Sequence, residues 1–262
     1  MLLHGFSQTG DSWAPVREAL GHDAPAPDLR GHGRAAALRP VSFGAVLSDL
    51  DLLVPDGAVL AGYSMGGRIA LRYALERPGR VGRLVLISAG PGLADPGART
   101  ARAAADARLA DRVEHGPIER FADEWSAQPL FAGQPPEVAR AARVDRLRNT
   151  PAGLAAALRG LGTGTMQPMW SRLGGVSVPV TLVVGETDAK FGAIAREMAV
   201  RLPDAEVLVV PGAGHAVHLE QPGAVARILG VAQRLPGVRL PTRVLGEPGS
   251  PHGPHEAPPP LR

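Results

Sequence analysis

Residues 59–70 read Val59-Leu60-Ala61-Gly62-Tyr63-Ser64-Met65-Gly66-Gly67-Arg68-Ile69-Ala70, an apolar run that passes through glycines and one serine into a helical pattern. The central G-x-S-x-G is typical of a nucleophile elbow, a sharp strand-to-helix turn. Side chains two residues before and after the serine would clash with the neighbouring strand and helix, so both positions require glycine. With 33 glycines in 262 residues, chance gives about 0.15 such matches, so an ordinary glycine-rich turn stays possible until the context decides.

Short apolar strands alternate with amphipathic helices on both sides of this stretch. We predict strands at residues 1–3, 24–28, 58–60, 81–88, 178–185 and 205–210, and helices at 11–20 (capped by Asp11 or Ser12), 42–53, 65–77, 190–202 and 221–234. The alternation predicts an α/β fold with a mostly parallel sheet and helices on both faces.

The strand pattern stops between residues 95 and 173, where an Ala- and Arg-rich sequence has helical spacing. We therefore expect a first core segment over residues 1–94, a helical lid over 95–173 and a second core segment over 174–235. Residues 236–262 are rich in proline and are expected to form a disordered tail, in which His252 and His255 are not expected to bind metal.

Composition narrows the function classes. A hydrophobic content of 45% favours a globular protein, and no apolar run approaches the length of a membrane span. The absence of cysteine excludes disulfides and thiolate catalysis, and no secretion signal is visible, so a cytoplasmic protein is expected. The charge of +3 is carried almost wholly by arginine interspersed with acids, and Lys190 is the only lysine; with 4% aromatics, nucleic-acid binding is not expected. No signal for an oligomeric state is present.

A serine after a central strand needs partners after later strands, with the acid before the histidine. The predicted strand at 178–185 is followed by Asp188, and the strand at 205–210 is followed by His215. Loops at the carboxyl edge of a parallel sheet bring such residues together. The imidazole of His215 would take the proton of Ser64, and the carboxylate of Asp188 would fix the imidazole tautomer and stabilise its charged form.

Two alternatives stay open within this triad, since Glu186 could serve as the acid and His218 as the base. An oxyanion also needs backbone N–H donors directed at one point. Met65, directly after the serine, supplies one by geometry, and Phe6, in the loop after the first strand, is the best candidate for the other.

The combined motifs resemble the α/β-hydrolase superfamily over residues 1 to about 235. They are Leu3-His4-Gly5-Phe6, Asp28-Leu29-Arg30-Gly31-His32-Gly33, Gly62-Tyr63-Ser64-Met65-Gly66-Gly67, Asp188 and Gly214-His215. The resemblance is specific for fold and triad but not for reaction, since esterases, lipases, lyases and C–C hydrolases share it. Members normally carry two further strands before the one at residues 1–3, so these N-terminal strands are expected to be missing here. Either the true start lies upstream, or the sheet lacks one edge and exposes another.

More particular stretches resemble one subfamily, the 2-succinyl-6-hydroxy-2,4-cyclohexadiene-1-carboxylate (SHCHC) synthases of menaquinone biosynthesis. They are Gly62-Tyr63-Ser64-Met65-Gly66-Gly67-Arg68, Pro91-Gly92-Leu93 followed by Arg99 and Arg102, Phe121-Ala122-Asp123-Glu124-Trp125, Gln128-Pro129-Leu130-Phe131, Leu147-Arg148-Asn149 and Gly185-Glu186-Thr187-Asp188-Ala189-Lys190-Phe191. The resemblance implies a lyase that eliminates pyruvate from 2-succinyl-5-enolpyruvyl-6-hydroxy-3-cyclohexene-1-carboxylate, with Ser64 acting as a base and with no metal or organic cofactor.

The substrate of that subfamily carries three carboxylates, for which the forked donors of arginine are well suited. Arg68 lies one helical turn after Ser64 and can face the same cavity. The resemblance implies that the substrate contacts are Arg68, Arg102 and Arg148 as carboxylate clamps, with Tyr63, Trp125 and Lys190 lining the pocket. Arg99 stays an alternative to Arg102.

Two other functions compete with this interpretation. A carboxylic-ester or C–C bond hydrolase would use the same triad through an acyl-enzyme or hydrolytic route, but would not need the arginines. A non-catalytic binding protein of the same fold would need no activated serine.

Overall fold

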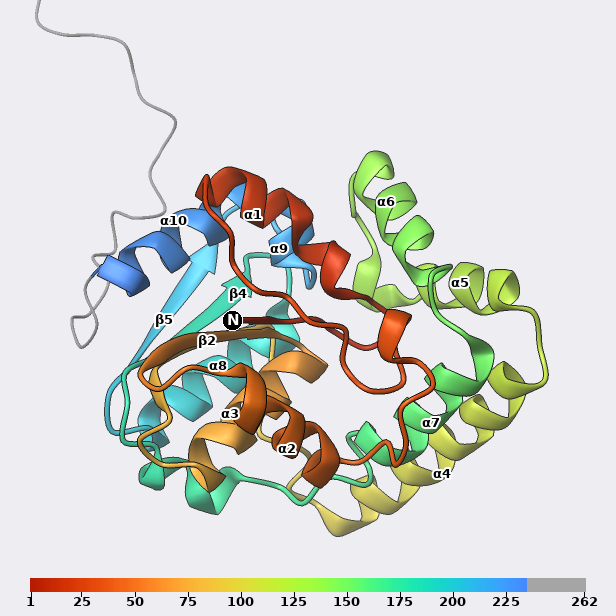
Figure 1. The fold of residues 1–262 in the computed structure, drawn as a ribbon, viewed down its shortest axis with the longest axis horizontal. Coiled ribbons are helices and arrows are strands. Elements are labelled where there is room, and N and C mark those ends of the chain that lie inside the picture. The colour runs from red at the N-terminus through yellow and green to blue at the C-terminus, as the bar shows by residue number, and fades with distance from the viewer. Residues whose placement is uncertain (235–262) are drawn as a thin grey trace, which may run out of the picture.

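The computed structural model describes residues 1–234 and contains a five-stranded sheet in the order β1-β2-β3-β4-β5, parallel at every pairing. The strands are β1 (Leu2–Leu3), β2 (Ala58–Tyr63), β3 (Val81–Ile87), β4 (Val180–Gly185) and β5 (Ala205–Val210). Parallel neighbours need crossover connections, which the helices supply (Figure 1). The predicted fold class is confirmed.

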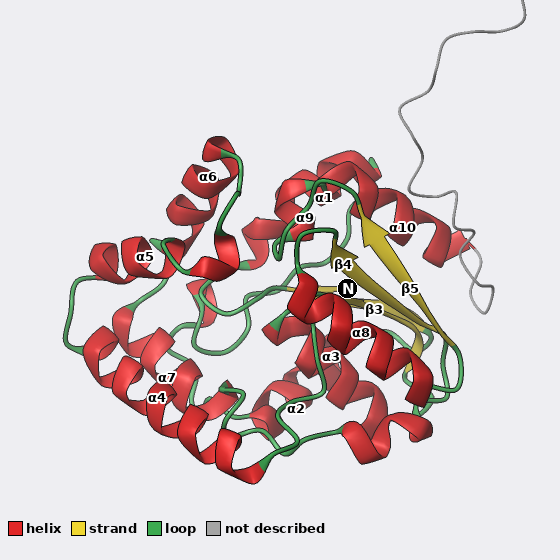
Figure 2. Cartoon of the chain, turned by 180° about the vertical axis from the view of Figure 1, so that it is seen from behind, coloured by secondary structure: helices red, strands yellow, loops and turns green. Residues whose placement is uncertain are grey.

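Helices cover both faces of the sheet (Figures 1 and 2). One face carries α2 (Phe43–Leu53), α3 (Met65–Glu76) and α8 (Ala189–Arg201), and the other carries α1 (Ala14–Leu20) and α10 (Pro222–Arg234). The buried run in β3 shows why two cores form. Leu84 and Leu86 pack in the first, while Val85 and Ile87 pack in the second, because successive strand residues point to opposite faces.

The helices between β3 and β4 gather at one side of the molecule (Figure 1). They are α4 (Pro96–Glu114), α5 (Ile118–Ser126), α6 (Pro136–Arg146) and α7 (Pro151–Leu161), with 3-10 helices at Pro129–Phe131 and Trp170–Gly175. Helix α4 packs on α7 and α5 on α6, and residues of α4, α5 and α7 form a small core of their own. The short α9 (Val217–Glu220), which follows β5, is an element that the sequence did not predict.

One predicted strand is wrong. Residues 24–28 form no regular strand, although the N–H of Leu2 donates to the carbonyl of Pro25 at 2.8 Å. Pro25 and Pro27 have no N–H and cannot complete a ladder, so the segment only lies beside β1.

The predicted cap of the first helix is also wrong. Thr9, not Asp11 or Ser12, is the capping residue: its Oγ1 accepts from the N–H of Asp11 at 3.2 Å and starts a 3-10 turn over Gly10–Trp13. The α-helix proper begins only at Ala14 and carries proline in its first turn, where the missing N–H costs nothing.

The proline-rich segment 236–262, with His252 and His255, lies outside the described residues. Among residues 1–234, no helix is both long and apolar enough to cross a membrane.

The elbow has the strained geometry that its glycines predict. Ser64 has φ 49° and ψ −105°, a positive φ that L-residues rarely adopt. A Cβ on Gly62 would lie 2.4 Å from the backbone of Gly66, and a Cβ on Gly66 would lie 2.2 Å from the carbonyl oxygen of Leu3 in β1. Glycine is therefore required at both positions by the close approach of helix and strand.

We expect Gly66→Ala to lower the free energy of unfolding by about 2–3 kcal/mol, because the strand backbone must move to admit the methyl group. Gly44→Ala is the matched control, since Gly44 lies in α2 with nothing within 4 Å of its added Cβ, and it should gain up to about 1 kcal/mol. Urea unfolding of both variants checks this. Equal effects of the two substitutions would contradict the steric account.

Candidate active site

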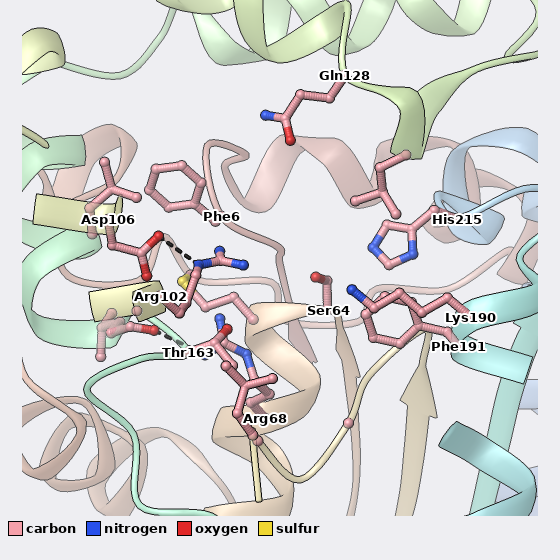
Figure 3. Close-up of a pocket in the computed structure, with 18 of the residues that line it drawn as sticks. Phe6, Ser64, Arg68, Arg102, Asp106, Gln128, Thr163, Lys190, Phe191 and His215 are labelled. Atoms are coloured by element: carbon pink, nitrogen blue, oxygen red, sulfur yellow. Dashed lines mark hydrogen bonds and ion pairs between the residues drawn. The ribbon is translucent and has the colours of Figure 1, made fainter. Parts of the chain in front are cut away.

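The carboxyl ends of the strands open onto a cavity of about 310 Å³ (Figure 3). Ser64 at the start of α3, His215 after β5 and Phe6 after β1 contribute to its wall. The helices after β3 supply further wall residues, among them Arg102 of α4 and Trp125 of α5. Residues from distant parts of the chain thus meet where the sheet topology places them.

Asp188 and His215 form a buried pair. The Oδ2 atom of Asp188 lies 2.6 Å from Nδ1 of His215, and the two residues are 8% and 3% exposed. The other carboxylate oxygen accepts from the N–H of Phe191 at 3.2 Å, because Asp188 caps α8. A carboxylate only accepts here, so Nδ1 carries the proton and Nε2 is the basic nitrogen. Ser64 lines the same cavity as this ring, and no hydrogen bond joins the two among the described residues.

The rival acid and base lie elsewhere. Glu186 accepts from the N–H of Gly212 at 2.9 Å and does not contact the imidazole. His218 is fully buried between the rings of Trp13 and Tyr63, and desolvation lowers its pKa to about 3. The geometry therefore favours Asp188 and His215.

The buried histidines predict an acid-sensitive fold. Burial lowers the pKa of His4 from its ordinary 6.5 to about 4, and lowers those of His32 and His218 to about 3. All three histidines are neutral in the folded protein and gain protons below pH 6.5 only after unfolding. Their contribution to the free energy of unfolding is therefore fully present above pH 6.5 and is lost as the pH falls towards 3–4. Between pH 7.5 and 5.5 the free energy of unfolding should drop by about 1.4 kcal/mol per histidine.

Urea unfolding of the wild type and of His218→Phe across this range measures the drop, and the variant should lose one histidine's share of it. A pH-independent free energy of unfolding would contradict the burial argument.

Two residues of the cavity wall offer backbone donors. Met65 is the first residue of α3, and the first N–H groups of a helix have no partner within it. The N–H of Phe6 forms no hydrogen bond within residues 1–234. Both residues line the cavity beside Ser64, and the positive end of the α3 dipole adds to the attraction for an oxyanion.

Cationic side chains also line the cavity: Arg68 and Arg102 lie on one side of Ser64, and Lys190 lies on the other side, beside His215 (Figure 3). Arg68 donates through Nη1 to the carbonyl of Leu161 at 3.1 Å, and burial, with Arg102 nearby, lowers its pKa to about 10, so it stays charged at neutral pH. The Nε atom of Arg102 donates to Asp106 at 2.8 Å. Lys190 also lines the cavity. The three cationic side chains in one cavity suit a polyanionic ligand.

Arg99, the alternative to Arg102, donates instead to the carbonyls of Leu93 and Ala94 and does not line this cavity. Trp125 lines the cavity.

The structure does not place Arg148 in the cavity. Its side chain is 55% exposed and pairs with Asp11 at 2.8 Å. The next residue, Asn149, points inward instead. Its side-chain amide donates to the carbonyl of Ser7 at 2.9 Å and accepts from the N–H of Gly33 at 3.0 Å. The stretch therefore fastens two core loops to the helices between β3 and β4, α4 to α7, which we call the helical block.

Tyr63 is likewise absent from the cavity wall. Its ring packs against His215 and His218, with centroids 5.4 Å and 4.2 Å away, and belongs to the core under α1 and α10. Strand alternation points Tyr63 to that face, and burial raises the pKa of its hydroxyl.

Sequence reasoning missed two charged residues in this region. Asp106 lines the cavity and lies four residues after Arg102, a helical spacing that could have revealed it. Arg146 is 2% exposed, donates to Ser126 at 2.7 Å and stacks over Phe131. Nothing in the sequence separates Arg146 from its many solvated neighbours.

Comparison with known proteins agrees with fold and site. Residues 1–228 match the alpha/beta hydrolase family, and the chain therefore belongs to it. A Bacillus subtilis (strain 168) protein assigned as an SHCHC synthase is 40% identical over 244 residues, 87% of each chain. The SHCHC synthase of Enterobacter sp. (strain 638) is 36% identical, covering 90% of this chain and 91% of its own.

Solved structures give the same result. MenH from S. aureus superposes with a TM-score of 0.82 at 31% identity, covering 89% of this chain and 92% of that one. An esterase from Thermogutta terrifontis follows with a TM-score of 0.75 at 29% identity, covering 90% and 89%.

Proposed function

We propose that this protein is an SHCHC synthase, a lyase of menaquinone biosynthesis that eliminates pyruvate from 2-succinyl-5-enolpyruvyl-6-hydroxy-3-cyclohexene-1-carboxylate. The observation that carries the proposal is that Arg68, Arg102 and Lys190 share one cavity with Ser64 and His215. A neutral ester needs no such wall, whereas a tricarboxylate does. The identity to SHCHC synthases along most of the chain supports it.

In the proposed mechanism, the Nε2 atom of His215 takes the proton of Ser64, and the Ser64 oxyanion removes the proton at ring carbon 2, alpha to the succinyl carbonyl. The carbonyl oxygen gains negative charge and lies against the N–H groups of Phe6 and Met65. The electron pair moves into the ring, forms the conjugated diene and breaks the bond from carbon 5 to the enolpyruvyl oxygen. The His215 imidazolium returns its proton to the departing enolate, which becomes pyruvate, so that Ser64 and His215 regain their starting states and no water is consumed.

The proposed roles of the remaining residues follow from their places. Asp188 would hold His215 in the required tautomer, and Arg68 and Arg102 would bind substrate carboxylates, with Lys190 and Trp125 beside them. The helices of residues 95–173 would act as the lid over the bound substrate, since they carry Arg102 and Trp125.

A carboxylic-ester or C–C hydrolase is the second candidate, favoured by the similarity to the Thermogutta esterase. Incubation with the enolpyruvyl cyclohexene separates the two. The synthase predicts equal amounts of pyruvate and of the ultraviolet-absorbing diene. No diene, together with rapid hydrolysis of p-nitrophenyl esters, would overturn the proposal in favour of the hydrolase.

A further inference from the structure

One carboxylate holds the main chain on both sides of His215. Glu220 ends α9, and its Oε2 accepts from the N–H of Gly214 at 2.5 Å while its Oε1 accepts from the N–H of Ala216 at 3.1 Å. Only His215 lies between these two amides. Hydrogen bonds to a charged acceptor are stronger and shorter than neutral ones, so this clamp fixes the backbone that carries the imidazole.

The sequence makes room for this clamp. A Cβ on Gly214 would lie 3.2 Å from Oε2 of Glu220, tighter than ordinary contact, so glycine lets the carboxylate approach the loop. Glu220 does not line the cavity. It therefore acts on the imidazole through the main chain, not through the substrate.

The helical block reaches the same carboxylate. Gln134, between the 3-10 helix Pro129–Phe131 and α6, donates through Nε2 to Oε1 of Glu220 at 3.2 Å. Three residues earlier, the ring of Phe131 packs edge-on against the imidazole of His215, with centroids 6.3 Å apart. This short segment thus contacts the histidine twice, once at its ring and once through its backbone clamp.

We propose that Glu220 is a positioning residue for His215, and that Gln134 links the Glu220 carboxylate to the helical block. A well-ordered helical block then helps to hold the His215 imidazole in place. The inference rests on the proposed function only in taking His215 as the base of Ser64. An imidazole displaced by about 1 Å loses on the order of 100-fold in rate, so the clamp has a measurable effect.

The test compares Glu220→Gln with Glu186→Gln. Glutamine at 220 keeps one acceptor oxygen but offers an NH₂ group to the second amide. Glu186 is a matched control, because it also accepts an amide of this loop, that of Gly212, but lies outside the pair that flanks the histidine. We expect Glu220→Gln to lower kcat about tenfold and Glu220→Ala about 100-fold, with KM changed less than twofold and Glu186→Gln close to wild type.

Two readouts separate positioning from general loss of structure and need no cyclohexene substrate. Labelling of Ser64 by a fluorophosphonate depends on His215, and the downfield proton resonance of Nδ1 reports its bond to Asp188. Both should weaken in Glu220→Gln and persist in Glu186→Gln, at temperatures where circular dichroism shows every variant folded. If the chain forms no diene but labelling follows this pattern, the proposed function fails and the clamp stands.

The proposal is overturned if Glu220→Gln keeps wild-type kcat, labelling rate and resonance, or if Glu186→Gln loses them equally. For the tie to the helical block, Gln134→Ala should lower kcat by about threefold while keeping the Nδ1 resonance, since it removes one neutral donor from the carboxylate. An unchanged kcat in Gln134→Ala would contradict this role of Gln134.

Discussion

Ser64→Ala is expected to lower kcat for the enolpyruvyl cyclohexene about 1,000-fold, with KM changed less than about threefold. A positioned base contributes on the order of 100- to 10,000-fold, and the substrate carboxylates would bind to other residues. The smaller side chain leaves the arginines and the two backbone donors in place. Steady-state kinetics with diene absorbance and pyruvate release as independent readouts measure the effect.

Ser88→Ala provides a matched control for this substitution. Ser88 also follows a strand, is fully buried and has a positive φ of 46°, and its hydroxyl has no hydrogen-bond partner within residues 1–234. The variant should keep wild-type kcat. Comparable losses in both variants would show that disturbance of the sheet edge, and not loss of a base, lowers activity.

Arg68→Met and Arg102→Met are each expected to raise KM for the tricarboxylate by about 10- to 100-fold, because each removes charge-assisted hydrogen bonds. The larger effect is expected for Arg68, because this residue is half-buried. Methionine keeps much of the packing volume of the arginine that it replaces. Hydrolysis of a small neutral ester, if measurable, should change little.

Arg148→Met is the control for these two variants, since this guanidinium pairs with Asp11 outside the cavity and should leave KM within about twofold. A large KM effect at Arg148, with none at Arg68, would mean that the substrate binds in another orientation or that the helical block rearranges around it.

Much of this site follows from local sequence. The elbow could be predicted because its glycines are required by contacts of the turn itself, and the close approaches at Gly62 and Gly66 show the steric reason. Asp188 and His215 could be placed because each lies in the segment after a strand, and parallel strands bring their carboxyl ends to one edge.

Other features of the fold and site depend on side-chain directions and long-range contacts that the local sequence does not reveal. Tyr63 lies next to the serine in sequence, but strand alternation points it to the opposite core. Arg148 is two residues beyond Arg146, and only the turn after α6 determines which of them points inward. Gln134 meets Glu220 across 86 positions, a pairing that no spacing rule predicts. The segment at 24–28 is apolar like a strand, but its prolines have no backbone N–H groups to donate to a neighbouring strand.

The most direct test of the account is the role of Ser64 as a base that removes a proton without forming a covalent intermediate. A single-turnover experiment compares the rate of diene formation from ordinary substrate with that from substrate deuterated at ring carbon 2. The account predicts a slower rate with deuterium, because that bond breaks in the step that Ser64 catalyses. Equal rates, with a substrate-derived mass added to Ser64 during turnover, would contradict it.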